Sequence, residues 1–234
     1  MRQAILLVVI AALQLALRVL FQGVPVVPHY IDFNPGIALV PAAGCFLGPA
    51  GAVVSAVASL AGDWWLGMWS ALSIFRGAGC LFFALSAGAL WPVARRLGWP
   101  GFILAGAVGS LVAASWTGIG MDLTRSYPFA YASTIVLVHD AAFCLVMGPG
   151  LSYLGRGLAG PDEQPWSFRA MWWVFWGAAG AWLMGIFVSG TFYRDWPFER
   201  YHLSDHSGIG LAFCVAPFLI LNVMGAIRAV MARS

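Results

Sequence analysis

The chain has little charge of either sign and no lysine at all. Only 9% of its 234 residues are charged, and all twelve basic residues are Arg. The absence of lysine excludes any mechanism that needs a lysine Schiff base, including retinal binding. The net charge of +3 is small and dispersed along the chain, so a nucleic-acid partner is not expected.

Catalytic and redox motifs are also missing from the sequence. The four Cys stand singly inside apolar segments, so neither a disulfide framework nor a CxxC site is indicated. There is no Walker A sequence, no Ser/His/Asp set, no paired acidic motif and no HExxH. We therefore expect no enzyme activity and no cofactor in this chain, and any ATP hydrolysis would have to come from partner subunits.

Hydrophobic residues make up 61% of the chain, and its mean hydropathy is +0.85. These values exclude an ordinary soluble domain and predict an all-α, polytopic membrane bundle of six to eight transmembrane segments. Gln14 and Arg18 interrupt the first apolar run, which we interpret as a retained helix rather than a signal peptide. The predicted segments are 4–21, 36–47, 50–66, 69–93, 102–119, 129–154, 168–189 and 208–231.

The stretch from residue 31 to residue 63 is broken more often than a simple membrane anchor would be. Pro35-Gly36, Pro41, Gly44 and Gly48-Pro49 interrupt its apolar run. Such irregular backbone is tolerated within a membrane only where it is buried in protein or lines a cavity. The sequence predicts a broken-helix hairpin near residues 35–62, with two short arms hinged at Gly48-Pro49. The hairpin either spans the membrane twice or is re-entrant, and both alternatives give an even number of crossings.

Arginine placement predicts the orientation of the bundle. In this layout one side carries Arg2, Arg95-Arg96, Arg156 and Arg228 with few acids, whereas the other side mixes arginines with most of the aspartates. Because basic residues favour the cytoplasmic side, we expect a multi-pass protein of the bacterial inner membrane, in contact with membrane lipids, with both termini cytoplasmic.

The order of glycine, proline and small residues resembles that of a known transporter family. The resemblance covers about residues 5–155, and it is with the S components of energy-coupling factor transporters. It is nearest the vitamin transporter-like group that includes proteins assigned as queuosine-precursor transporters. The residues that carry it are Asn34-Pro35-Gly36, Pro41, Gly44, Phe46, Gly48-Pro49, Gly51-Ala52, Gly62-Asp63, Ser73-Ile74-Phe75, Gly77, Tyr127-Pro128-Phe129-Ala130, His139-Asp140 and Gly148-Pro149-Gly150.

The resemblance implies a substrate-binding subunit that captures a small vitamin-like molecule at its external face. Other membrane subunits and an ATPase module would then energise its transport. In that family an Ala-xxx-Ala face on the first helix docks the scaffold subunit, and Ala12 and Ala16 have that spacing here. The chain departs from the family pattern after residue 155. Residues 156–234 are expected to add two C-terminal transmembrane helices to the same membrane domain.

Polar and aromatic residues at the predicted external ends of the helices are candidate ligand contacts. A pocket there would combine apolar walls with a few placed polar groups. We expect an acid and an arginine to make polar contacts and a tryptophan to stack on a flat ring. The alternatives are a hydrated loop and an interfacial acid beside aromatic belt residues. The candidates are His29, Tyr30, Asp32, Asn34, Asp63, Trp64, Trp65, Asp122 and Arg125.

Two further patterns involve histidine or cysteine. His139-Asp140 lies inside an apolar segment, where ionisable residues mark functional sites, although the pair could equally orient helices. No metal site is expected. Two patterns contain possible metal ligands, but each has a simpler structural interpretation. His202 and His206 have an i,i+4 spacing but read as part of a loop, and Cys80 reads as a small packing residue.

These observations leave two functional hypotheses. The first is a membrane substrate-binding and transport subunit for a small vitamin-like molecule, energised by partner subunits. The alternative is a structural or accessory membrane subunit of a larger redox or photosynthetic complex.

Overall fold

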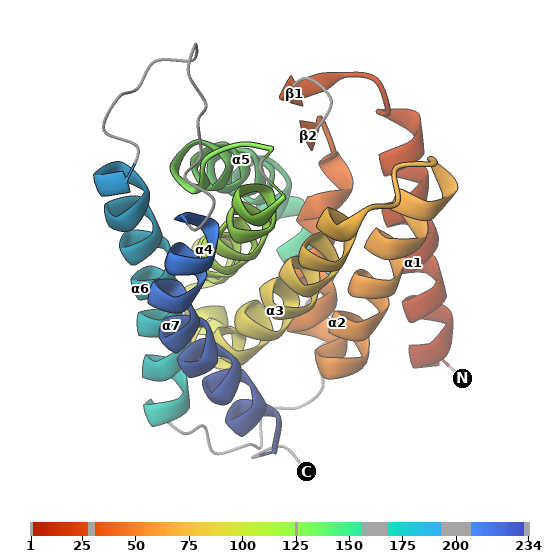
Figure 1. The fold of residues 1–234 in the computed structure, drawn as a ribbon. Helices are drawn as coiled ribbons and strands as arrows, with labels where there is room; N and C mark the ends of the chain where they lie inside the picture. Colours follow the sequence, from red (N-terminus) through yellow and green to blue (C-terminus); the bar gives the residue numbers. More distant parts are fainter. Residues whose placement is uncertain (1, 28–30, 125, 156–167, 193–206, 232–234) are drawn as a thin grey trace.

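The computed structural model describes residues 2–27, 31–124, 126–155, 168–192 and 207–231. Seven helices in these ranges are long and apolar enough to cross a membrane, which confirms the predicted all-α polytopic bundle (Figure 1). Each predicted segment matches a helix or a helical arm, with ends that differ by a few residues. The helices are α1 (Arg2–Leu20), α2 (Leu39–Trp65), α3 (Ala71–Ala94), α4 (Trp99–Leu123), α5 (Phe129–Gly155), α6 (Phe168–Phe192) and α7 (Ser207–Met231).

Helix α2 is a hairpin of two arms rather than one straight helix. Its backbone breaks at Gly48, with φ 63° and ψ −142°, immediately before Pro49. A Cβ atom on Gly51 would lie 2.2 Å from the carbonyl oxygen of Ala43. In a straight helix eight residues would separate these groups by about 12 Å, so the two arms fold back on each other. The hinge predicted at Gly48-Pro49 is confirmed.

Both outer ends of the hairpin lie beside the C-terminal half of α1. A Cβ on Gly36 would lie 3.1 Å from the backbone oxygen of Gln14, and one on Gly62 would lie 2.8 Å from the Arg18 side chain. Gln14 and Arg18 are one helical turn apart. The hairpin therefore starts and finishes at the same end of the bundle as the end of α1.

A short ribbon and a 3₁₀ helix connect α1 to the hairpin. Strand β1 (Pro25–Val27) pairs antiparallel with β2 (Ile31–Asp32), and the 3₁₀ helix η1 (Pro35–Ala38) follows. The side-chain oxygen of Asn34 accepts a hydrogen bond from Gly36 N at 3.1 Å and caps η1. This connection lies at the top of the bundle in Figure 1. The predicted external loop is therefore a structured element in its described part.

Helices α6 and α7 pack together on the far side of the bundle from α1 (Figure 1). Asn222 of α7 holds them in place through buried hydrogen bonds to two other helices. Its amide nitrogen donates to Val174 O of α6 at 2.9 Å, and its amide oxygen lies 3.2 Å from Ser86 Oγ of α3. Helices α6 and α7 thus pack directly on the helices that precede them.

The beginning of α1 and the end of α7 lie at the same end of the bundle (Figure 1). The α2 bend is at this end too, because Gly48 and Pro49 share a small apolar cavity with Ala226 and Ala229 near the end of α7. With the hairpin counted as two arms, the chain runs along the bundle an even number of times. Which end faces the cytoplasm remains a prediction.

Candidate functional site

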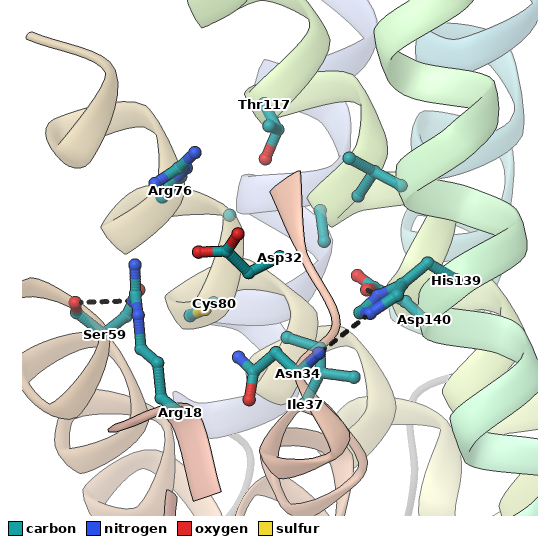
Figure 2. Close-up of a pocket in the computed structure, with 13 residues that line it drawn as sticks. Arg18, Asp32, Asn34, Ile37, Ser59, Arg76, Cys80, Thr117, His139 and Asp140 are labelled. Carbon is teal, nitrogen blue, oxygen red and sulfur yellow. Dashed lines mark hydrogen bonds and ion pairs between the residues drawn. The ribbon is translucent and has the colours of Figure 1, made fainter. Parts of the chain in front are cut away.

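A charged cavity of about 110 Å³ lies near the end of the bundle that holds the ribbon (Figure 2). His139 lies ten residues inside α5, so the cavity reaches roughly 15 Å below the helix ends. This volume is enough for several water molecules or a small ligand. Every lining residue precedes α6: Arg18, Asp32, Asn34, Ile37, Ser59, Arg76, Gly79, Cys80, Ala113, Thr117, Val136, His139 and Asp140.

Two arginines form one wall of the cavity. Arg18 of α1 donates through Nη1 to Ser59 O at 3.0 Å and through Nη2 to Asp63 Oδ1. Nη1 of Arg76, from the first turns of α3, lies 3.4 Å from the same Asp63 oxygen. Asp63 is fully buried behind the two guanidinium groups and does not line the cavity itself. Because a buried charge needs a partner, Asp63 fixes both arginines at this wall.

A histidine–aspartate pair from α5 forms the opposite wall. Nδ1 of His139 lies 2.8 Å from Asp140 Oδ1, and Nε2 lies 3.2 Å from the backbone nitrogen of Asn34. The Asn34 N–H can only donate, so Nε2 accepts and the single imidazole proton is on Nδ1. His139 is therefore a neutral bridge between the Asp140 carboxylate and the segment that connects β2 to η1.

Asp32 enters the cavity from strand β2 and points toward the arginine wall in Figure 2. Neither guanidinium is within ion-pairing distance of its carboxylate, and Asp32 has no side-chain hydrogen bond within the described part of the chain. The cavity thus holds cationic and anionic groups on separate elements, with Asp32 between them.

A smaller cavity of about 30 Å³ continues from the first one between α1 and the hairpin. It shares Arg18, Asn34 and Ser59 with the larger cavity and ends at Gln14. The Gln14 amide nitrogen donates to Ser55 Oγ at 3.1 Å, whereas its amide oxygen has no partner among the described residues. Polar groups therefore extend inward below the charged site.

Several residues predicted from the sequence meet at the cavity. Asp32, Asn34, His139 and Asp140 line it, and the half-buried Cys80 lies on the α3 side. The Asp140 carboxylate pairs with its neighbour His139. Among the described residues no group of three His, Cys, Asp or Glu side chains could hold a metal ion.

Other predicted residues lie away from the cavity. Trp64 and Trp65 are 70% and 69% exposed on the outer surface and do not line it. Asp122 is buried, and its Oδ2 accepts a hydrogen bond from Phe129 N at 2.9 Å near the start of α5. Ala12 and Ala16 are exposed on the outer face of α1. The predicted residues His29, Tyr30, Arg125, His202 and His206 lie outside the described part of the chain.

Sequence reasoning missed four polar contributors to the cavity. In the sequence Arg18 is only an interruption of the first apolar run, and no motif singles out Arg76, Ser59 or Thr117. The available signal was the position of each arginine within an apolar helix, where a charge requires a partner. Asp63, the partner of Arg18, is 45 residues away in the sequence. A separation of this length does not predict that the two residues are in contact.

The charged groups of the cavity can bind ligand groups of either charge. Guanidinium groups hold carboxylates and phosphates, and carboxylates hold N–H donors and cations. The apolar groups of Ile37, Ala113 and Val136 lie among these polar groups.

Comparisons of the chain with protein families, curated proteins and solved structures gave no match.

Proposed function

We propose that this chain is a membrane substrate-binding and transport subunit for a small vitamin-like molecule. The observation that carries the proposal is the charged cavity between α1, the hairpin, α3, α4 and α5. The His139–Asp140 pair lies about 15 Å inside the bundle, and Arg18, Arg76 and Asp32 line the same cavity nearer its end. Ionisable side chains inside a membrane bundle are costly, and they commonly mark substrate pathways. Irregular backbone in a membrane protein is tolerated where it lines a cavity, and the segment from β2 to η1 lines this one through Asp32, Asn34 and Ile37.

The resemblance to S components supports the same proposal and adds partners to it. Such a subunit would bind its substrate at the external end and be energised by a scaffold subunit and ATPases. The described cavity lies at the end of the bundle opposite to the start of α1 and the end of α7. If both termini are cytoplasmic, as the arginine distribution predicts, the cavity faces the outside of the cell.

The direct test is mass spectrometry of small molecules that remain bound after purification in a mild detergent. We expect the wild type to retain one molecule and the cavity-filling variant Ala113→Leu to lose it. Val138→Leu is the matched control, because Val138 is 62% exposed on the outside of α5. A monodisperse size-exclusion profile is required of all three proteins. Loss of the bound molecule can then be attributed to filling of the cavity and not to misfolding.

The same preparation distinguishes the alternative function. An accessory subunit of a larger complex would co-purify with other membrane subunits in fixed stoichiometry and carry no small molecule in this cavity. That result would contradict a substrate-binding role. Retention of the same molecule by Ala113→Leu at wild-type level would place the binding site elsewhere.

A further inference from the structure

Cationic and anionic side chains line the cavity from different elements of the fold. Arg18 and Arg76 come from α1 and α3, whereas Asp140 comes from α5 and Asp32 from β2. From this separation we propose that the ligand is a small zwitterion, with a carboxylate group held by the arginines and an ammonium or similar N–H donor held by Asp32 and Asp140. This inference rests on the proposed function and specifies the chemistry of its substrate.

The arginine wall has donors left for a ligand oxygen. A guanidinium group has five N–H donors. The described contacts of Arg18 are two hydrogen bonds to Ser59 and one to Asp63, so at least two of its N–H groups are not used by them. The planar fork of Arg matches the two oxygens of a carboxylate, which makes this wall the place for the anionic group.

The opposite wall has acceptors left for a ligand donor. Asp140 is 4% exposed, lines the cavity and uses Oδ1 for His139, and its Oδ2 has no hydrogen bond within the described residues. Asp32, which lies between the two walls and points toward the arginines, has no side-chain hydrogen bond within the described residues either. A buried carboxylate without a full set of donors is costly, so a ligand that brings N–H groups gains a large part of its affinity here.

The same layout disfavours ligands with only one charge. A simple anion would sit close to the Asp32 and Asp140 carboxylates, and a simple cation would sit close to two guanidinium groups. Each would leave one wall of the cavity unsatisfied while excluding water from it. Ile37 and Val136 supply apolar surface in the cavity, which suits a short aliphatic spacer between the two ends of a zwitterion.

The test is a binding series in nanodiscs with probes that differ only in charge and length. The zwitterions are 3-aminopropanoate, 4-aminobutanoate and 5-aminopentanoate, compared with the acids and the primary amines of the same chain lengths. We expect at least one zwitterion to bind more tightly than both its acid and its amine, by roughly tenfold to a hundredfold for each lost charge-assisted hydrogen bond.

Two variants assign the ends of the probe. In Arg76→Gln the advantage of the zwitterion over the amine should fall, and in Asp32→Asn its advantage over the acid should fall. Arg96→Gln is the matched control, because Arg96 is exposed in the short 3₁₀ turn after α3, far from the cavity. It should leave both advantages unchanged.

The zwitterion proposal is overturned if an acid or an amine binds as well as every zwitterion, if no probe binds, or if neither variant changes the preferences. Its failure is separable from that of the proposed function. Suppose that a molecule without paired charges co-purifies with the wild type and is lost from Ala113→Leu. This result would support the binding role and contradict only the zwitterion proposal. If no molecule co-purifies and no probe binds, both proposals fall.

Discussion

Asp63 holds the arginine wall together, since Arg18 and Arg76 both approach its Oδ1 atom. Breaking a buried ion pair by removing one partner leaves an uncompensated charge and costs about 3–5 kcal/mol. We therefore expect Asp63→Asn to lower the stability of the protein by about this amount, measured by thermal unfolding in detergent. The double variant Arg18→Gln/Asp63→Asn should be more stable than the sum of the single effects implies. Strictly additive effects would show that the pair is not coupled.

His139 joins two elements through its two ring nitrogens. Replacing it with Phe removes the acceptor for the Asn34 N–H and the donor to Asp140. Loss of a buried hydrogen bond costs about 1–3 kcal/mol. Amide hydrogen exchange of Asn34, Gly36 and Ile37 should then be faster in His139→Phe, by roughly fivefold to a hundredfold. Exchange at the wild-type rate would mean that His139 does not hold this segment.

At the scale of elements, the hairpin could be predicted because its cause is local. Gly48 adopts a positive φ that other residues rarely adopt, and Pro49 lacks the N–H that a continuous helix would use. Both residues can be identified from the sequence without knowledge of distant contacts. Segment length and hydropathy predicted the other helices for the same reason, since a bilayer imposes one length on all of them.

The side chains that meet at the cavity could be predicted only in part. Asp63 faces the interior, whereas Trp64 and Trp65, the next two residues, face outward because successive residues of a helix differ in direction by about 100°. The sequence shows that these residues are adjacent but not how the arm is rotated. The rotation depends on contacts with Arg18 of α1 and Arg76 of α3, which are distant in sequence.

The hairpin and α3 approach so closely at Gly44 that no side chain fits. A Cβ there would lie 1.9 Å from the backbone oxygen of Ala84. Gly44→Ala should separate the two elements and lower the thermal unfolding temperature or prevent folding. Gly150→Ala is the matched control, because nothing lies within 4 Å of the added Cβ on α5. It should be neutral or stabilise the helix by up to about 1 kcal/mol. Equal effects of the two changes would contradict the close contact.

At the scale of the whole molecule, the outer face of α1 is the surface predicted to bind a partner. Ala12 and Ala16 are exposed there, so changing both to Leu should not disturb the described fold. Small residues permit close approach of another helix, and two Leu side chains would block it. We expect the Ala12→Leu/Ala16→Leu variant to insert and fold normally but to lose co-purification with a partner subunit. Wild-type co-purification of the double variant would reject this docking face.

The direction of the chain through the membrane decides whether the cavity can bind an external substrate. The start of α1, the turn after α3 and the end of α7 lie at one end of the bundle, and the loop between α2 and α3 lies at the other (Figure 1). The test replaces the four native cysteines and introduces a single cysteine in turn at Arg2, Leu97, Met231 or Trp69. Labelling of each cysteine shows on which side of the membrane that position lies.

With an impermeant thiol reagent on intact cells, only Trp69→Cys should be labelled, because the arginine distribution places both termini in the cytoplasm. All four positions should react after the cells are opened, which controls for exposure. Labelling of only one of Arg2→Cys and Met231→Cys would contradict an even number of passes and therefore the hairpin. Labelling of both, with Trp69→Cys protected, would keep the hairpin but turn the cavity toward the cytoplasm. The protein could then not capture a substrate from outside the cell.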